Sequence, residues 1–374
     1  MATNKFAFFI VAFALMLSPL AYAGQVVSLS GQVVDQDTGD PLPYAHVFVK
    51  DIGTVTNVGG YFNLAVDESM LSYELKASYI GYKSTNISLK DEQDLNKIVV
   101  KMAAVSLELE GVQVRSGDMI LQKVINRIDF NYEYSHQSAL CFFRETLDTQ
   151  FGKQYVAEGI MDIYLPNNYS NNDIQVSVVK SRKSTFESEL AEDFTMIKGH
   201  AMDMVQSIVW RDDSFLNKKK RKHYDFTYDG VTMYNEKEVL IVKFWPKTRK
   251  GRFHGQMYVD IESYAIIKVE YFPDTKKSRF WEDVRWTEEF NYRNGRWFLS
   301  RVSYEGKWYE YDQVFDFRSM LVVNIVETVD GMPAMGLLIK EDDTFFEEAK
   351  KEVLTEEFWK GFSYVELDEE TSSY

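Results

Sequence analysis

Cysteine is almost absent from this 374-residue chain. Cys141 is the one cysteine, so no intramolecular disulfide can form. It lies within Ala-Leu-Cys-Phe-Phe, a run that predicts a buried small apolar residue. Histidine is also scarce, with five residues, and none is followed three positions later by glutamate. His200 and Asp203 could share one face of a helix, but zinc usually takes at least three protein ligands. The sequence therefore predicts no metal site.

The chain also lacks the short motifs of common catalytic sites. It contains no Gly-x-Ser-x-Gly elbow, no Walker loop and no Gly-x-Gly-x-x-Gly fingerprint. Adjacent acidic residues do occur, at Glu288-Glu289, Asp342-Asp343 and Glu347-Glu348. In a chain with 57 acidic residues such pairs arise by chance, and we interpret them as solvated surface. We therefore expect no catalytic residue and no cofactor-binding residue, and no cofactor.

Positive charge is in deficit. The 42 Lys and Arg residues leave a formal net charge of −15, which disfavours nucleic acid and anionic membrane surfaces as partners. One basic run, Lys218 to Lys222, is the exception, with Arg249, Lys250 and Arg252 further along. These residues could bind an anion or acidic lipid headgroups. Lysines also discourage strand edges from pairing, and we favour this second interpretation of a solvated loop and strand edge.

Long apolar runs are missing beyond the N-terminus, so we expect no transmembrane helix. At the N-terminus, Lys5 precedes an apolar run from Phe6 to Leu17, and Ala21-Tyr22-Ala23 gives a small-x-small cleavage pattern. This combination predicts a cleaved secretory signal peptide over residues 1–23. A membrane anchor would need about 20 apolar residues. The expected location is the periplasm, the outer membrane surface or the exterior.

Proline and glycine are also few, at 7 and 20 residues, which argues against a disordered chain. Aromatic residues are abundant at 15%, and Tyr and Phe favour strands. The N-terminal part shows short alternating segments separated by turn clusters between residues 28 and 102. One of these segments, Tyr44 to Val49, places Ala45, Val47 and Val49 on one face. This spacing is typical of a β-sandwich.

Five motifs in this part occur in the order found in one family: Gly31-Gln-Val-Val-Asp35, Thr38-Gly-Asp-Pro-Leu-Pro-Tyr-Ala45, Gly53-Thr54, Gly60-Tyr-Phe62 and Tyr79-Ile-Gly-Tyr-Lys83. Together they resemble the carboxypeptidase-regulatory-like domain. The resemblance implies an Ig-like or prealbumin-like sandwich of a type abundant in exported Bacteroidetes proteins. It is a resemblance to the accessory domain of metallocarboxypeptidases and not to the peptidase, so it implies no catalytic zinc.

The rest of the chain predicts a second, α+β domain. We expect a linker over residues 103–117, an antiparallel-sheet domain with helices over 118–340 and an acidic tail over 341–374. Helical spacing predicts helices at 118–131 and 199–216 and a short one near 345–354. Residues 224–329 read as a β-meander, in which Asn294-Gly295 is a strong hairpin signal. The predicted fold class is mainly β: residues 25–102 form the sandwich, and a large curved antiparallel sheet with covering helices follows.

The segment Gly255 to Lys268 resembles the hairpin of LolA/LolB-type folds, which implies an open curved sheet with an apolar concavity. More broadly, residues 118–365 resemble a family of uncharacterised Bacteroidetes envelope proteins. The matching residues are Phe143-Arg144-Glu145-Thr146, Ala157-Glu158-Gly159, Lys180-Ser-Arg-Lys183 and Phe358-Trp359.

Strand alternation predicts one apolar and one wet face around this hairpin. The candidate ligand-facing residues are Phe253, Met257, Val259 and Ile261, and the expected wet residues are His254, Gln256, Tyr258 and Asp260. A nearby aromatic cluster could line a ligand site, but we favour core filling for it. It consists of Trp281, Trp286, Trp297 and Trp308 with Tyr292, Tyr304, Tyr309 and Tyr311.

These observations favour a noncatalytic exported protein of the cell envelope. In this interpretation the sandwich is an interaction module, and the sheet domain binds a protein or an apolar ligand. The alternative is a LolA-like carrier of lipid or lipoprotein. A hydrolase or carboxypeptidase is disfavoured because no catalytic constellation is present.

Overall fold

The computed structural model describes residues 25–105, 116–132, 135–166, 174–186, 201–273, 281–293, 295–310, 312–333, 335–340, 343–349 and 356–367. The predicted signal peptide, His200 and Tyr311 lie outside these ranges. Within the described ranges, no helix is long and apolar enough to cross a membrane.

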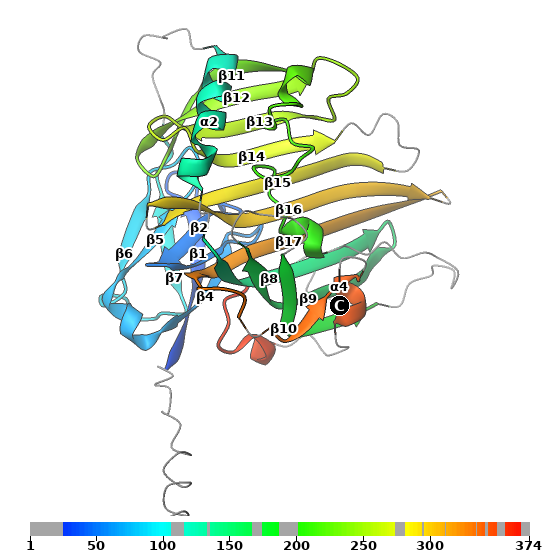
Figure 1. The fold of residues 1–374 in the computed structure, drawn as a ribbon. Helices are drawn as coiled ribbons and strands as arrows, with labels where there is room; N and C mark the ends of the chain where they lie inside the picture. Colours follow the sequence, from blue (N-terminus) through cyan, green and yellow to red (C-terminus); the bar gives the residue numbers. More distant parts are fainter. Residues whose placement is uncertain are drawn as a thin grey trace, which may run out of the picture.

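The described residues form three antiparallel or mixed sheets and few helices (Figure 1). The strands are β1 (Val26–Asp35), β2 (His46–Val49), β3 (Ile52–Val55), β4 (Tyr61–Asp67), β5 (Glu74–Ser78), β6 (Thr85–Ser88), β7 (Ile98–Met102), β8 (Gln137–Thr149), β9 (Gly152–Leu165), β10 (Gln175–Thr185), β11 (Tyr224–Tyr234), β12 (Lys237–Pro246), β13 (Phe253–Asp260), β14 (Ile266–Pro273), β15 (Trp281–Arg293), β16 (Arg296–Glu310), β17 (Gln313–Thr328) and β18 (Leu337–Ile339). The helices are α2 (Gly117–Asn131), α3 (Ala201–Met204) and α4 (Phe345–Glu348), with 3-10 turns η1 (Glu68–Ser72), η3 (Arg221–His223) and η5 (Glu356–Trp359).

The first seven strands make a sandwich of two small sheets, ordered β4-β1-β7 and β3-β2-β5-β6. Their inward side chains, among them Val33, Val47 and Phe62, are fully buried in one apolar core. Strand β1 pairs in parallel with β7, and Gly31 lies directly at this contact. A Cβ at Gly31 would lie 1.9 Å from the carbonyl oxygen of Ile98, so no larger residue fits there. The glycine of the first family motif therefore allows the close approach of two strands.

The remaining strands form one sheet of eleven, in the order β11-β12-β13-β14-β15-β16-β17-β8-β9-β10-β18. Its central strands are long; β17 alone spans 16 residues. The predicted hairpin joins β15 to β16, and Gly295 has the positive φ of 87° that such a tight turn requires. The predicted fold class, a mainly β chain with a small sandwich and a large antiparallel sheet, is confirmed.

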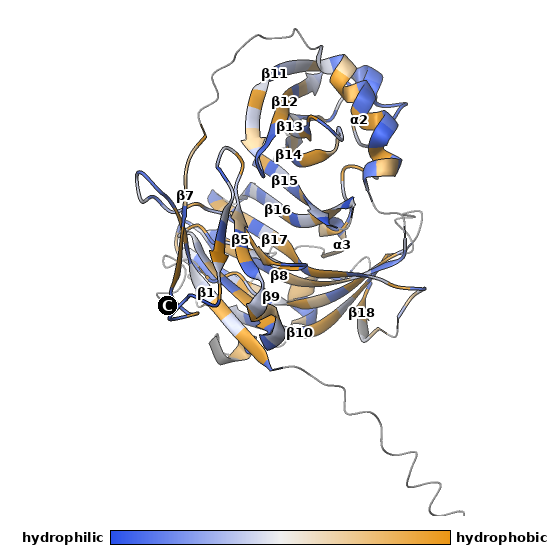
Figure 2. Cartoon of the chain, turned by 90° about the vertical axis from the view of Figure 1, so that its left-hand side faces the viewer, coloured by the Kyte–Doolittle hydropathy of each residue, from blue (hydrophilic) through white to orange (hydrophobic). Residues whose placement is uncertain are grey.

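The two faces of the large sheet have different neighbours. Figure 2 shows α2 and α3 on one side and the sandwich on the other, with the sheet curving around the side of the helices. We name these the covered face and the sandwich face. Because neighbouring side chains in a strand point to opposite sides, each long strand contributes to both faces.

Of the three predicted helices, one is found, one is wrong and one is only partly within the described residues. α2 confirms the helix expected over 118–131. The helix expected over 199–216 is wrong: the described part of this stretch is helical only in α3 and continues as turns. Side chains there bond their own backbone, since the hydroxyls of Ser207 and Ser214 accept from the N–H of Val209 and Leu216. Such local bonds compete with helix formation. In the tail, α4 covers the start of the expected helix, and residues 350–355 lie outside the description.

Candidate functional site

The covered face of strands β12 to β14 is lined by apolar side chains. Phe253, Met257 and Val259 of β13, three of the candidate ligand-facing residues, point to this face and are buried, Met257 and Val259 completely. The fourth, Ile261, lies in the turn after β13 and packs on the edge of the same cluster. We call this cluster the first apolar cluster; its other sheet members include Val239, Leu240, Val242, Phe244, Ile266, Val269 and Tyr271. The structure thus brings the four residues together, and their contact with a ligand stays a prediction.

The expected wet face is only partly wet. His254 is exposed and stacks on Phe272, and Gln256 and Tyr258 are half-buried. Asp260 is buried, contrary to the expectation, because its carboxylate accepts bonds from the N–H and the hydroxyl of Ser263 at 2.7 and 2.6 Å. It closes the turn between β13 and β14.

An irregular stretch of chain lies over the first apolar cluster. We call residues 205–216 the covering segment; its apolar side chains Ile208, Val209, Phe215 and Leu216 are buried in the cluster. The ring of Phe215 packs on that of Phe244 in β12, with 4.0 Å between the two ring centroids. In Figure 1 the chain between α3 and β11 crosses the front of the sheet. This part of the cover is therefore made of turns.

Helix α2 is the second part of this cover. Ile120, Leu121 and Val124 face the cluster. At its end, the hydroxyl of Tyr132 donates to the carbonyl of Ile266 at 2.9 Å and accepts from its N–H at 2.8 Å. These two bonds attach the end of α2 to the first residue of β14.

The covered face continues under strands β8 to β10 and β16 to β17. Here α3 and α4 pack on a second apolar cluster, in which the ring centroids of Phe345 and Phe143 lie 4.7 Å apart. Cys141 belongs to this cluster and is fully buried, as predicted, and burial raises the pKa of its thiol. The two clusters share partly buried Trp286 and Leu299 at their border, so the apolar lining runs across most of the sheet.

One carboxyl group lies within this apolar face. Glu288 of β15 is 1% exposed and accepts hydrogen bonds from the Ser207 hydroxyl at 2.7 Å and from the N–H of Ile208 at 2.9 Å. The hydroxyl of Tyr271 also donates to it at 3.0 Å. Burial raises the pKa of the Glu288 carboxyl, and the three hydrogen bonds oppose that rise. This carboxyl therefore joins the covering segment to the sheet at a position where a charge is costly to bury.

The next residue, Glu289, points to the sandwich face. Its carboxylate pairs with Arg301 at 2.9 Å, with His46 of the sandwich at 3.0 Å and with Lys268 at 3.5 Å. Burial acts to raise the pKa of Glu289, but the charges of Arg301 and Lys268 outweigh it, and the pKa lies well below its usual value. The expectation that Glu288-Glu289 is solvated surface is therefore wrong. Their position within a strand flanked by Trp286 and Phe290 was the available signal for burial.

Several polar contacts join the sandwich to the sheet around this ion pair. Arg293 donates to the carbonyl of Asp51 at 2.6 Å, and Asn324 donates to that of Gly53 at 2.9 Å. A pocket of about 150 Å³ remains between the two, lined by Tyr44, His46, Tyr79, Ile80, Tyr234, Tyr258, Ile267, Lys268, Glu289 and Phe290. Its charged groups already pair with one another. We interpret this pocket as part of the junction that fixes the sandwich to the sheet.

The C-terminal part of the described chain covers the sandwich face of β8 to β10. Glu158 is fully buried between Arg144 and Arg182, at 2.6 and 2.5 Å. Arg144 also donates to the carbonyl of Val365 at 2.6 Å, and Trp359 packs edge-on against Phe142. Phe358 and Trp359 pack on the sheet in one apolar cluster. One residue from each of the four segments that match the envelope family thus lies at this place: Arg144, Glu158, Arg182 and Trp359.

The aromatic cluster predicted from sequence is split between core and surface. Trp297 belongs to the first apolar cluster, Trp286 packs on both clusters, and Trp308 and Tyr304 pack on the second. Tyr292 and Tyr309 are exposed at 61% and 39%. The side chains of Trp281 and Tyr311 are outside the description. Core filling is thus confirmed for four members of the cluster.

The His, Cys, Asp and Glu side chains of the described residues form no set of metal ligands, since no group of three or more of them could hold a metal ion. His46 faces Glu289 and Asn291, and His136 faces Tyr164, so neither adjoins a serine or cysteine in these contacts.

Comparison with known proteins identifies the N-terminal part. The model of the CarboxypepD_reg-like domain matches residues 29–114, so the chain contains a domain of this family, as the five motifs indicate. A comparison with curated protein sequences finds no match.

Solved structures similar to the part after the sandwich are remote. They include a domain assigned to outer membrane lipoprotein sorting from Vibrio parahaemolyticus (11% identity, TM-score 0.30, covering 58% of this chain and 95% of that one). A LolA superfamily protein from Nitrosomonas europaea has 11% identity and a TM-score of 0.25, covering 59% of this chain and 96% of that one. A DUF1329 family protein from Desulfovibrio piger has 9% identity and a TM-score of 0.27, covering 59% and 96%. At these TM-scores the similarities do not establish a common fold.

Proposed function

We propose that this protein is a noncatalytic, exported binding protein of the cell envelope that carries an apolar ligand. The ligand, a lipid or the acyl chain of a lipoprotein, would lie between the covered face of the large sheet and the covering segment. The observation that carries the proposal is the pairing of a long apolar sheet face with a cover that includes one segment of turns, residues 205–216.

Opening of the covering segment should cost less free energy than opening of the sheet beneath it. Segments with little regular structure open locally at lower free energy than central strands do. Five apolar side chains of the covering segment are buried, four of them in the first apolar cluster. Ser207 and Ile208 of the segment bond to one buried polar anchor on the sheet, Glu288. When the segment lifts, Glu288 regains water, which offsets part of the cost of exposing apolar surface. An apolar chain could then replace Ile208, Val209, Phe215 and Leu216 on the sheet.

In this proposal the chain is divided as the sequence suggests: a cleaved signal over 1–23, the sandwich over 25–102, a linker over 103–117, the carrier domain over 118–340 and a tail over 341–374. The sandwich would be the interaction module for another envelope protein. The second candidate function is a scaffold without a ligand. Complete burial of Met257 and Val259 in a filled core favours it.

Quenching of tryptophan fluorescence by a brominated fatty acid separates the two. Trp210 of the covering segment packs on the first apolar cluster, 6.3 Å from the Tyr132 ring. We expect saturable quenching of the wild type, and Trp210→Phe should remove a clear part of it. Trp245→Phe is the matched control. Trp245 follows the buried Phe244 in β12, so its side chain points to the opposite face of the sheet, and it is 42% exposed. A wild type without saturable quenching would exclude the carrier and leave the scaffold.

A further inference from the structure

Two neighbouring loops hold an unusual concentration of positive charge. Residues 217–223 contain five Lys and Arg, residues 247–252 contain four, and neither loop has an acidic residue. The whole chain, in contrast, has 57 acidic and 42 basic residues. We call these two loops the basic patch.

The loops form one surface. The carbonyl oxygen of His223 accepts bonds from the N–H of Lys247 at 2.8 Å and of Thr248 at 3.3 Å. The Thr248 hydroxyl also lies 3.0 Å from the His223 ring. Burial together with the nearby Lys222, Lys250 and Lys220 lowers the pKa of His223, as expected where several cations converge.

Most of this charge is unneutralised and faces water. Among the described residues, Lys247 is the one cation of the patch that forms an ion pair, with Asp225 at 3.1 Å. All of the nine basic side chains except the half-buried Arg221 are exposed. Protection of a strand edge does not explain the patch, because its cations lie in loops. The edge strand β11 itself contains acidic residues, Asp225 and Asp229, and no basic one. Concentrated charge of one sign attracts an oppositely charged surface.

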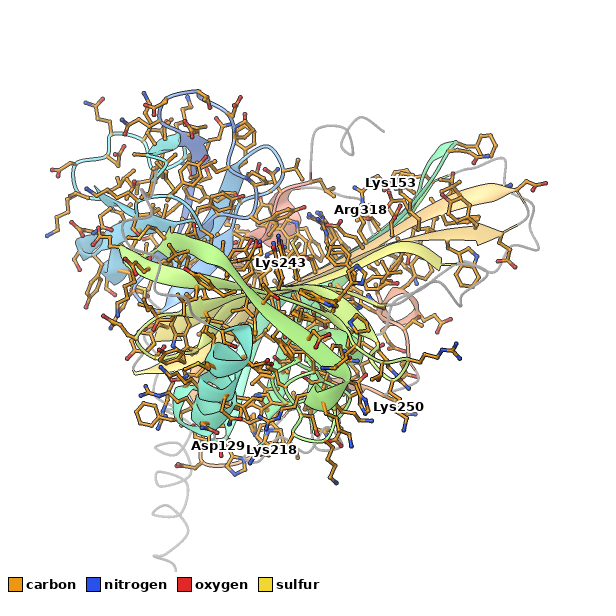
Figure 3. All side chains as sticks on the ribbon, turned by 90° about the horizontal axis from the view of Figure 1, so that it is seen from above. Asp129, Lys153, Lys218, Lys243, Lys250 and Arg318 are labelled. Carbon is orange, nitrogen blue, oxygen red and sulfur yellow. The ribbon has the colours of Figure 1, made fainter. Side chains whose placement is uncertain are left out.

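The patch adjoins the cover of the proposed ligand site. It begins at Asn217, directly after Phe215 and Leu216 of the covering segment. Arg221 donates to Gln122 of α2 at 2.7 Å. Figure 3 shows the labelled Lys218 and Lys250 on the same side of the molecule as α2, away from Arg318 and Lys153. Just before the second loop, near the end of β12, Trp245 is 42% exposed, and tryptophan is enriched at membrane–water interfaces.

We propose that the basic patch docks the protein on a bilayer of anionic lipids, with the covering segment next to the headgroups. The phosphate groups would contact the lysines and arginines of the two loops, and Trp245 would lie at the interface. Docking would place the opening cover beside the lipid that enters or leaves. This inference deepens the proposed function and rests on it for its purpose, but the docking itself can be measured separately.

Co-sedimentation of the full chain with vesicles tests the docking. The probe is a vesicle of phosphatidylglycerol and phosphatidylcholine, compared with phosphatidylcholine alone. The variant Lys218→Glu/Lys220→Glu/Lys250→Glu should bind the anionic vesicle at least about tenfold more weakly than wild type. The matched control, Lys90→Glu/Lys97→Glu/Lys101→Glu, makes the same charge change at exposed residues of the sandwich and should bind as wild type does. High salt should abolish the wild-type binding.

Three outcomes would overturn the docking proposal. These are equal binding to both vesicle types, equal loss in both triple variants, and equally tight binding to soluble polyglutamate, which would indicate an acidic protein partner. The fatty-acid quenching assay is run in parallel without vesicles. A wild type that binds anionic vesicles but shows no quenching would remove the carrier function and leave the docking in place. Quenching without vesicle binding would do the reverse.

Discussion

Glu-to-Gln substitution at two adjacent residues, Glu288 and Glu289, should change the free energy of unfolding by very different amounts. Both residues are buried on β15, and their side chains point to opposite faces of the sheet. Glu288→Gln keeps an oxygen that can accept from Ile208 and Tyr271, and its new amide can donate to the Ser207 hydroxyl. We therefore expect a change in the free energy of unfolding of no more than about 1 kcal/mol at pH 7, in the stabilising direction.

Glu289→Gln should be far more harmful. It removes the carboxylate that neutralises Arg301, whose Nη1 has no hydrogen-bond partner among the described residues. Removal of one partner from a buried ion pair costs about 3–5 kcal/mol, because the other charge stays buried. Urea unfolding of both variants and the wild type measures the difference. Equal losses in the two variants would refute the assignment of the residues to opposite electrostatic environments.

The pH dependence adds a second test, with opposite signs. The pKa of Glu288 is raised in the fold. Its contribution to the free energy of unfolding is therefore fully present below the usual pKa of 4.5 and is lost as pH rises through the raised pKa. The pKa of Glu289 is lowered, so its contribution is present above 4.5 and is lost as pH falls through the lowered value. Glu288→Gln should therefore flatten the decline in stability above pH 4.5. Glu289→Gln should reduce the loss of stability that the wild type shows below pH 4.5.

Two further predictions concern packing. Met257→Asp should lower the melting temperature sharply, because it puts a carboxylate into the first apolar cluster, whereas His254→Asp on the other face should have little effect; similar melting temperatures would refute the assigned faces. Trp359→Ala should cost about 3–5 kcal/mol in urea unfolding, because it empties the site between Phe142 and Arg182, and Tyr292→Ala at an exposed site should cost less than 1; a small loss at Trp359 would show that the C-terminal segment is not fixed to the sheet.

Local sequence patterns predicted the parts of this fold that local physics determines. The hairpin at Gly295, helix α2 and the alternation of Phe253, Met257 and Val259 each depend on residues close in sequence. The sandwich was predictable because its turn and glycine motifs match a known family. Gly31 shows why this fold requires a glycine in such a motif: its missing Cβ permits a contact with Ile98, 67 positions away.

What the sequence did not reveal depends on contacts between distant segments. The stretch 199–216 has apolar residues at helical spacing, but Glu288 accepts the N–H of Ile208 from 80 positions away. The acidic pair on β15 looked like solvated surface because its cations are not local: Arg301 comes from β16, Lys268 from β14 and His46 from the sandwich. The basic patch likewise joins two loops separated by the β11–β12 hairpin.

The position of Glu288 links stability to the proposed function. A carboxyl in an apolar face is a poor choice for a permanent core, since an apolar residue of similar size would avoid the desolvation cost. It suits a contact that opens, because water reaches the group as soon as Ser207 and Ile208 move away. Opening then lowers its pKa toward the usual value and releases a proton wherever the closed form is protonated. Opening of the covering segment should therefore become easier as pH rises, and Glu288→Gln should abolish that dependence while leaving the apolar lining unchanged.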